Sequence, residues 1–165
     1  MRVLSLVLST VVLAAPASST VRLDGSTAPA LGGAHVGTLP AAVKLFGRPD
    51  RVVSCTASWS RYRVTIAFKP AATGACTGSS LGPWQQVTLR AARWHTQAGL
   101  HVGDTAATLH ALYPNASQLD FVEPNLWELE TGGPLCDGGR PLALAGRIVS
   151  GDVSALVVLH VPACG

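Results

Sequence analysis

The sequence is poor in charged side chains, and lysine is almost absent from it. Asp, Glu, Lys and Arg together make up 13% of the 165 residues, about half of the ~25% that is usual in soluble domains. Lys44 and Lys69 are the two lysines, and the net charge of +3 comes with no RNA- or DNA-binding signature. We therefore expect no nucleic-acid partner.

Motifs that mark common catalytic sites are also missing. The chain has no G-x-S-x-G nucleophile elbow, no H-E-x-x-H pair and no glycine-rich phosphate loop between a strand and a helix. Its cysteines have no C-x-x-C spacing, which argues against a zinc site or a catalytic thiol. The sequence thus predicts a protein that is not an enzyme and that uses no cofactor or metal.

Two weaker chemical possibilities have a more ordinary explanation. His35 and His101 occupy similar sequence contexts and could share a metal ion, but a histidine just before a helix more often serves as a hydrogen-bonding group. Glu123, Glu128 and Glu130 could supply paired carboxylates for sugar hydrolysis. Carboxylates on an exposed strand would lack the raised pKa that this role needs.

An N-terminal export signal is the clearest positive feature of the sequence. Met1-Arg2 gives a positive start, an apolar run covers residues 3–14, and Ala15-Pro16-Ala17 supplies the small residues that a signal peptidase reads. The run is too short to span a bilayer, which needs about 20 residues. We expect residues 1–17 to be removed and the protein to be secreted, with no stable membrane insertion.

The cysteines are consistent with an extracellular protein. Cys55, Cys76, Cys136 and Cys164 all follow the predicted cleavage site, and an even number in an exported protein predicts two disulfides. Of three possible connectivities we favour Cys55–Cys76 with Cys136–Cys164, because each pair closes a loop within one half of the chain. A crosslink of this size contributes about 3 kcal/mol to stability.

A repeated segment organises the rest of the chain. His35-Val36-Gly37 recurs 66 residues later as His101-Val102-Gly103. Each copy precedes a helix-capping residue, Thr38 or Asp104, a short apolar run and a proline, which predicts two short helices. Gly47 can take the left-handed conformation that ends the first helix. The apolar residues expected to face the core are spaced three apart and comprise Val43, Phe46, Leu109 and Leu112.

Strand-like segments follow each predicted helix. They cover residues 51–57, 61–68 and 86–94 in the first half, and 118–122, 126–130, 142–149 and 152–161 in the second. We predict an α+β protein in which two tandem units, residues 34–97 and 98–165, form one antiparallel sheet with short helices packed on one face. Residues 18–33 are expected to be a flexible lead-in with at most a short strand at 20–23.

The phrase Gly37-Thr38-x-x-x-x-Val43-x-x-x-Gly47-x-Pro49, followed by antiparallel strands, resembles two known families. One is the β-lactamase inhibitory proteins, which are secreted and contain two such units. The other is the small outer-membrane-assembly lipoproteins, which contain one. The lipid-attachment cysteine of the second family is missing here, and no inhibitor-contact residue of the first can be matched. The resemblance implies a fold and a binding role, without a β-lactamase target.

Side-chain alternation along the predicted strands separates an inner from an outer set. Tyr62, Val64, Ile66 and Phe68 should lie under a helix, and the other parity should form an open sheet face. Exposed Trp and Arg side chains are typical of binding hot spots. The predicted binding face consists of Trp59, Arg61, Arg63, Arg90 and Trp94. In the second half the residues expected to point outward are Glu128, Glu130, Arg147 and His160.

Charge is distributed unevenly between the two halves. Residues 35–95 carry eight Lys or Arg and one Asp, whereas residues 96–165 carry two Arg and seven Asp or Glu. The simpler interpretation, which we favour, is attraction between the halves or solubility. The alternative is a polarised surface that steers a partner.

The function that these features favour is a secreted, non-enzymatic module that binds or inhibits an extracellular protein through its open sheet face. A small secreted hydrolase or cell-wall-active enzyme is the first alternative, and a deep cleft that gathers His and carboxylate side chains would indicate it. A structural envelope protein is the second alternative. A flat or gently concave sheet would favour binding.

Overall fold

The structure is a computed structural model that describes residues 19–23, 28–71, 74, 76, 81–120, 122–132 and 142–160. The predicted signal peptide, residues 1–17, and two of the four cysteines, Cys136 and Cys164, lie outside the described residues.

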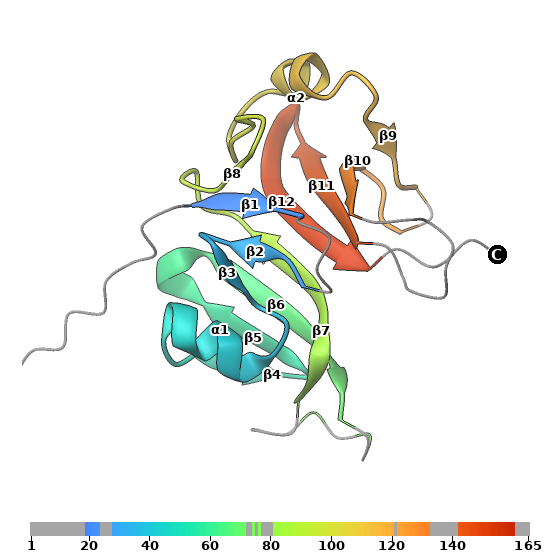
Figure 1. The fold of residues 1–165 in the computed structure, drawn as a ribbon. Coiled ribbons are helices and arrows are strands. Elements are labelled where there is room, and N and C mark those ends of the chain that lie inside the picture. Colours follow the sequence, from blue (N-terminus) through green and yellow to red (C-terminus); the bar gives the residue numbers. More distant parts are fainter. Residues whose placement is uncertain are drawn as a thin grey trace, which may run out of the picture.

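An eight-stranded antiparallel sheet dominates the fold (Figure 1). Its order is β4 (Arg51–Val53), β5 (Thr56–Trp59), β6 (Val64–Pro70), β7 (Leu81–Leu89), β12 (Asp152–His160), β11 (Leu142–Val149), β10 (Leu126–Gly132) and β9 (Ser117–Gln118). Two helices, α1 (Leu39–Phe46) and α2 (Ala106–Leu112), accompany it, with a 3₁₀ turn at Ser60–Tyr62. The predicted α+β class with antiparallel strands is confirmed.

A second, four-stranded sheet departs from the prediction of a single sheet. Its order is β3 (Ala34–His35), β2 (Ala30–Leu31), β1 (Thr20–Arg22) and β8 (His95–Thr96), and β1 runs parallel to β8. The short strand expected at residues 20–23 is present as β1, and residues 30–31 form a second paired strand within the segment that was expected to be flexible. Val21 and Leu31 are fully buried, so apolar burial holds this segment against the rest of the chain.

Both predicted helices form, with one change of cap. Thr38 Oγ1 accepts the Ala41 N–H at 3.3 Å, and the helix ends at Gly47, which has a φ of 80°. In α2 the capping residue is Thr105, because the Asp104 carboxylate instead accepts the His101 N–H at 2.7 Å in the preceding turn. No helix of the described residues is long and apolar enough to cross a membrane.

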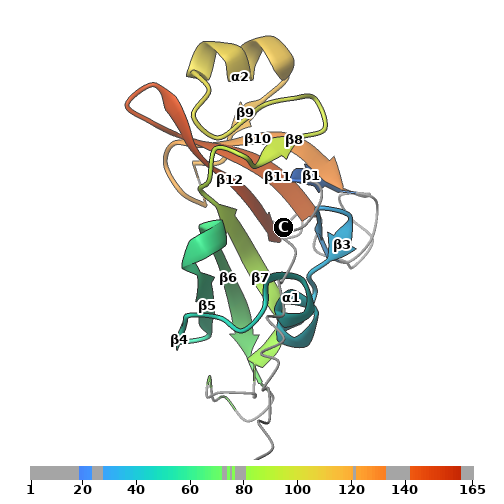
Figure 2. The same cartoon turned by 90° about the vertical axis from the view of Figure 1, so that its left-hand side faces the viewer.

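The helices pack on the same face of the large sheet. The Phe46 ring of α1 lies 5.6 Å from Trp59 of β5, measured between centroids. Leu109 of α2 packs so closely on β11 that a Cβ built at Gly146 would lie 2.8 Å from its Cδ1. Figure 2 shows α1 and β3 on one side of β5–β7. We call the opposite side of the large sheet the open face.

The sheet register defines which residues occupy the open face. Arg51, Ser58, Thr65 and Thr88 lie directly opposite one another across β4 to β7. The adjacent row contains Val53, Thr56, Ala67 and Gln86. Farther along, over β11 and β12, the same side carries a small buried apolar cluster of Leu119, Leu126, Ala143, Ala145, Ala155, Val157 and Leu159. The accessible part of the open face is therefore its polar half, over β4–β7.

A disulfide fastens one end of this region. Cys55 and Cys76 are bonded, which confirms the favoured pairing for this half of the chain. Cys55 sits with Ser54 in the two-residue turn between β4 and β5, and both residues have positive φ values, 63° and 46°. A turn with that backbone matches the twist of a hairpin. The bond thereby links the β4–β5 hairpin to the segment that follows β6.

Candidate functional site on the open face

The two tryptophans of the predicted binding face belong to the core instead. Trp59 is 2% exposed and Trp94 is completely buried. The Trp59 indole N–H donates to the Gly47 carbonyl at 2.8 Å, and that of Trp94 donates to the Tyr62 carbonyl at 3.1 Å. The prediction that Trp59 and Trp94 are exposed on the open sheet face is therefore wrong.

A turn between β5 and β6 explains the error. The prediction gives Trp59 the same parity as Arg61 and Arg63 of the following strand, but a 3₁₀ turn separates β5 from β6 there. Trp59 pairs directly with Val64, and paired residues of an antiparallel ladder point to the same side of the sheet. Trp94 lies beyond the end of β7 at Leu89, where strand alternation no longer applies.

The inward set was predicted correctly. Tyr62, Val64, Ile66 and Phe68 are all buried, at most 4% exposed. They belong to the main core, which also includes Phe46 of α1. For Val64, Ile66 and Phe68 the prediction holds because β6 is a continuous strand from residue 64 onward, so its alternation is not interrupted. Tyr62 precedes this strand, in the 3₁₀ turn.

The predicted arginines divide between two locations. Arg61 is exposed and lies over the Tyr62 ring, 5.7 Å from its centroid, beside the end of α1. Arg63 and Arg90 are also exposed, but they lie together at one end of the open face, where the Arg90 N–H donates to the Arg63 carbonyl at 3.0 Å. The site is thus narrower than predicted and contains Arg63 and Arg90 without Arg61.

A shallow hollow of about 260 Å³ lies between these two arginines. We call it the Arg63–Arg90 hollow, and it is lined by Ser58, Trp59, Ser60, Arg63, Val64, Thr65 and Arg90. Three of its lining residues, Ser58, Ser60 and Thr65, carry hydroxyl groups, and Arg63 and Arg90 supply its charged groups. Its outline suits a single side chain of a partner better than a large ligand, since ligand pockets usually exceed ~300 Å³.

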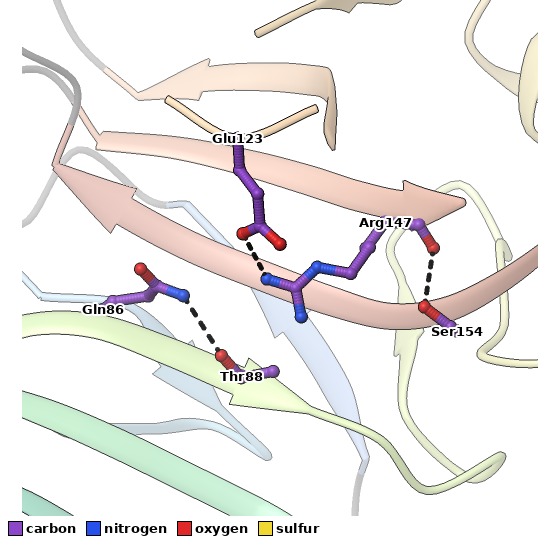
Figure 3. Close-up of polar contacts among 5 residues, drawn as sticks. All are labelled: Gln86, Thr88, Glu123, Arg147 and Ser154. Carbon is purple, nitrogen blue, oxygen red and sulfur yellow. Dashed lines mark hydrogen bonds and ion pairs between the residues drawn. The ribbon is translucent and has the colours of Figure 1, made fainter. Parts of the chain in front are cut away.

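A third arginine continues the row across the sheet. Arg147 of β11 pairs with Ala155 of β12, and Ala155 precedes Leu156, which pairs with Leu89. Arg147 therefore lies in line with Arg90, two strands away. One carboxylate partners it: Arg147 Nη2 donates to Glu123 Oε2 at 2.6 Å (Figure 3). Its Nε is buried and has no hydrogen-bond partner.

Polar residues near this row form hydrogen bonds with one another and with the backbone of Arg147. Ser154 Oγ donates to the Arg147 carbonyl at 3.2 Å, and Gln86 Nε2 donates to Thr88 Oγ1 at 3.3 Å (Figure 3). Glu123 lies between β9 and β10, outside any strand. Strand alternation therefore could not have placed Glu123 on this face, and no other signal in the sequence did.

The arginines raise the positive potential around one another. Burial, then the charges of Arg147 and Arg63, lowers the pKa of Arg90, while the Glu123 carboxylate acts in the opposite direction. Three guanidinium groups with one carboxylate leave the row with excess positive charge. An arrangement of this kind attracts anions, above all those that can accept two parallel hydrogen bonds.

The second-half residues expected to point outward take different positions. A bulge between Glu128 and Glu130 shifts the register, so Glu130 turns to the covered face and accepts a hydrogen bond from Tyr113 Oη at 2.9 Å. Glu128 stays on the open side and accepts from Thr131 Oγ1. His160 pairs with Leu142 on the covered side, and its ring lies 4.5 Å from Trp84. Outward orientation was wrong for Glu130 and His160.

The other chemical candidates do not converge. His35 Nδ1 donates to the Ala28 carbonyl at 3.1 Å, whereas His101 stacks on His95 with centroids 4.9 Å apart. Among the residues that the structure describes, no three or more His, Cys, Asp or Glu side chains gather closely enough to hold a metal ion. A cavity of about 460 Å³ beside β1 and β8 includes Arg22 and His95 in its lining, which contains no carboxylate.

No protein-family model, curated protein or solved structure matches the chain. The function therefore has to be argued from the open face itself.

Proposed function

We propose that this protein is a secreted binding module that docks an extracellular protein on its open face, without catalysis. The observation that carries the proposal is the pair of exposed arginines at the Arg63–Arg90 hollow. Within the described part of the chain neither Arg63 nor Arg90 forms an ion pair. Arginine held beside a shallow hollow is a frequent contributor to binding energy in protein interfaces.

The surface around the hollow supports a protein partner. It combines half-exposed hydroxyl side chains such as Ser58 and Thr65 with Val53, which is 46% exposed. This mixture of polar and apolar side chains over an antiparallel sheet is similar to the composition of non-obligate interfaces. A rigid sheet also limits the conformational entropy that is lost on docking.

An internal duplication is part of the proposal. Each half presents a short helix followed by four strands of the large sheet, and the sheet order runs outward in both directions from the β7–β12 pair. This order supports two tandem units, residues 34–97 and 98–165. In such an arrangement the first unit carries the docking surface, and the second extends the sheet on which that surface is built.

Secretion can be tested on the mature protein. The disulfide between Cys55 and Cys76 suits an oxidising compartment. We expect the secreted protein to begin at Ser18 and to show no free thiol before reduction, with Cys136 and Cys164 forming the second bond. Mass spectrometry of the N-terminus and of alkylated cysteines checks both points. A mature chain that retains residues 1–17 would contradict the secretion proposal.

The docking surface can be tested by partner capture. Immobilised wild-type protein is exposed to the culture fluid of the organism that makes it, beside an Arg63→Asn/Arg90→Gln variant. Asn is chosen at position 63 because Arg63 has a φ of 51°, a conformation that Asn tolerates. Arg22→Gln and Arg48→Gln serve as controls, since both are exposed arginines away from the open face.

We expect a captured protein that the double variant loses and that both control variants retain. Equal capture by the double variant would refute the assignment of this surface. Turnover of a cell-wall substrate by the wild-type protein would favour the hydrolase alternative instead.

A further inference from the structure

We propose that the Arg63–Arg90 hollow is a carboxylate-binding site whose occupant is an Asp or Glu side chain of the protein partner. This inference rests on the proposed docking function and adds to it the chemistry of the contact. It is argued from the charge of the hollow, its size, and the unusual backbone at Arg63.

The nearby carboxylates of the chain itself are already occupied. Asp50 Oδ2 accepts the Ser60 N–H at the margin of the hollow, and Glu123 pairs with Arg147. Arg63 and Arg90 line a space together with Ser58 and Thr65. An incoming carboxylate would supply the negative charge that this part of the surface lacks.

The backbone at Arg63 is a second, independent observation. This residue has a φ of 51° in the left-handed region, which is unfavourable for most non-glycine residues and is adopted more readily by Gly or Asn. Strained residues that carry a functional side chain are common at binding sites. The left-handed turn places the Arg63 carbonyl where it accepts the Arg90 N–H, so the two arginines are tied together through the backbone.

The side-chain types favour a carboxylate on a protein over a sulfated or phosphorylated polymer. A polyanion is best held by an extended track of basic residues. Here Arg63 and Arg90 are neighbours and Arg51 lies one row away, but the row after that, Val53, Thr56, Ala67 and Gln86, carries no charge. The adjacent row offers Val53, Thr56 and Ala67, which can contact apolar and main-chain atoms beside an acidic side chain. Arginine rather than lysine also matches the planar, two-oxygen geometry of a carboxylate.

The test uses a defined probe on the full secreted protein with its disulfide intact. The probe is an N-acetylated, C-amidated heptapeptide that contains three Glu residues, and its control replaces each Glu with Gln. Binding is followed through the Arg Nε–Hε signals in NMR titrations. The variants are Arg63→Asn, Arg90→Gln and Arg90→Lys, with Arg48→Gln as the matched control.

We expect the Glu peptide to shift the Arg63 and Arg90 signals, and the Gln peptide to leave them in place. The affinity for the Glu peptide should fall about tenfold in Arg63→Asn and Arg90→Gln. It should fall less in Arg90→Lys, which keeps the positive charge but loses the two parallel N–H donors of the guanidinium group. It should stay unchanged in Arg48→Gln. It should also weaken several-fold between about 50 and 200 mM salt, because charge attraction is screened.

Several outcomes would overturn the inference. Equal binding of the Gln peptide would show that charge is not recognised. Tighter binding of heparin than of the Glu peptide, lost in the same variants, would assign the site to a polyanion. Concentration-dependent dimerisation that the Arg63→Asn variant abolishes would assign it to a second copy of the chain. If the variants lose partner capture but the Glu peptide does not bind, the docking function stands and the carboxylate site fails.

Discussion

Replacing Trp94 with alanine should destabilise the protein severely. The side chain is completely buried and contacts Phe46 edge to face, with centroids 6.3 Å apart. A buried tryptophan removes about 150–250 Å² from water, which is about 4–6 kcal/mol at ~25 cal/mol per Å². The change also leaves the buried Tyr62 carbonyl without its 3.1 Å donor. Measured Trp-to-Ala substitutions in cores cost about 3–5 kcal/mol, and we expect about 4–5 kcal/mol here.

The measurement is urea unfolding of the oxidised protein, followed by far-UV circular dichroism so that the lost indole does not affect the signal. Trp94→Phe should cost about half as much, because it keeps an aromatic ring but not the hydrogen bond. Arg90→Ala, an exposed change on the open face, should stay within about 0.5 kcal/mol. A Trp94→Ala protein whose stability lies within about 1 kcal/mol of the wild type would refute the assignment of this residue to the core.

Three further predictions concern other parts of the fold. Replacing Cys55 and Cys76 with Ser opens a loop with a sequence separation of 21 and should lower the free energy of unfolding by about 3 kcal/mol; denaturation with and without reductant checks this, and an unchanged midpoint would contradict it. Desolvation raises the pKa of Tyr113 to about 12, against 10 for an exposed tyrosine. The folded state thus holds the phenol proton more tightly, so this contribution to the free energy of unfolding should be complete below pH 10. It should fall by about 1–2 kcal/mol between pH 10 and 12, after allowance for solvent screening. Tyr113→Phe should lack this loss, and identical stability profiles of the wild type and the variant at alkaline pH would contradict the prediction. Gly146→Ala would place a Cβ 2.8 Å from Leu109 Cδ1 and should lower the free energy of unfolding by about 1–3 kcal/mol. Thermal unfolding measures this loss, and an unchanged or higher melting temperature would show that α2 packs less tightly on β11.

Local features of the fold could be predicted because each depends on neighbours in the sequence. The cap at Thr38 and the positive φ at Gly47 follow from residue type within one helix. The buried parity of Val64, Ile66 and Phe68 follows from alternation within one strand. These elements needed no knowledge of the rest of the chain.

Interruptions of regular structure account for the errors in the candidate site. The 3₁₀ turn at Ser60–Tyr62 resets the alternation between Trp59 and the next strand, and a bulge reverses it between Glu128 and Glu130. An irregularity of one residue moves a side chain to the opposite face of a sheet. Nothing in the residue types at these positions distinguishes a turn or bulge from a continuous strand.

Residue order alone was enough for the α+β class, the two helices and the presence of two arginines on one sheet face. It favoured the pairing of Cys55 with Cys76 among three possible connectivities, and the structure decided it. The burial of Trp59 and Trp94, the strand pairing of residues 20–22 and the alignment of Arg147 with Arg90 depended on the three-dimensional arrangement. The physical reason is the range of the interactions. Caps and alternation act over a few residues, whereas contact between strands more than fifty residues apart is decided by how the whole chain buries its apolar surface.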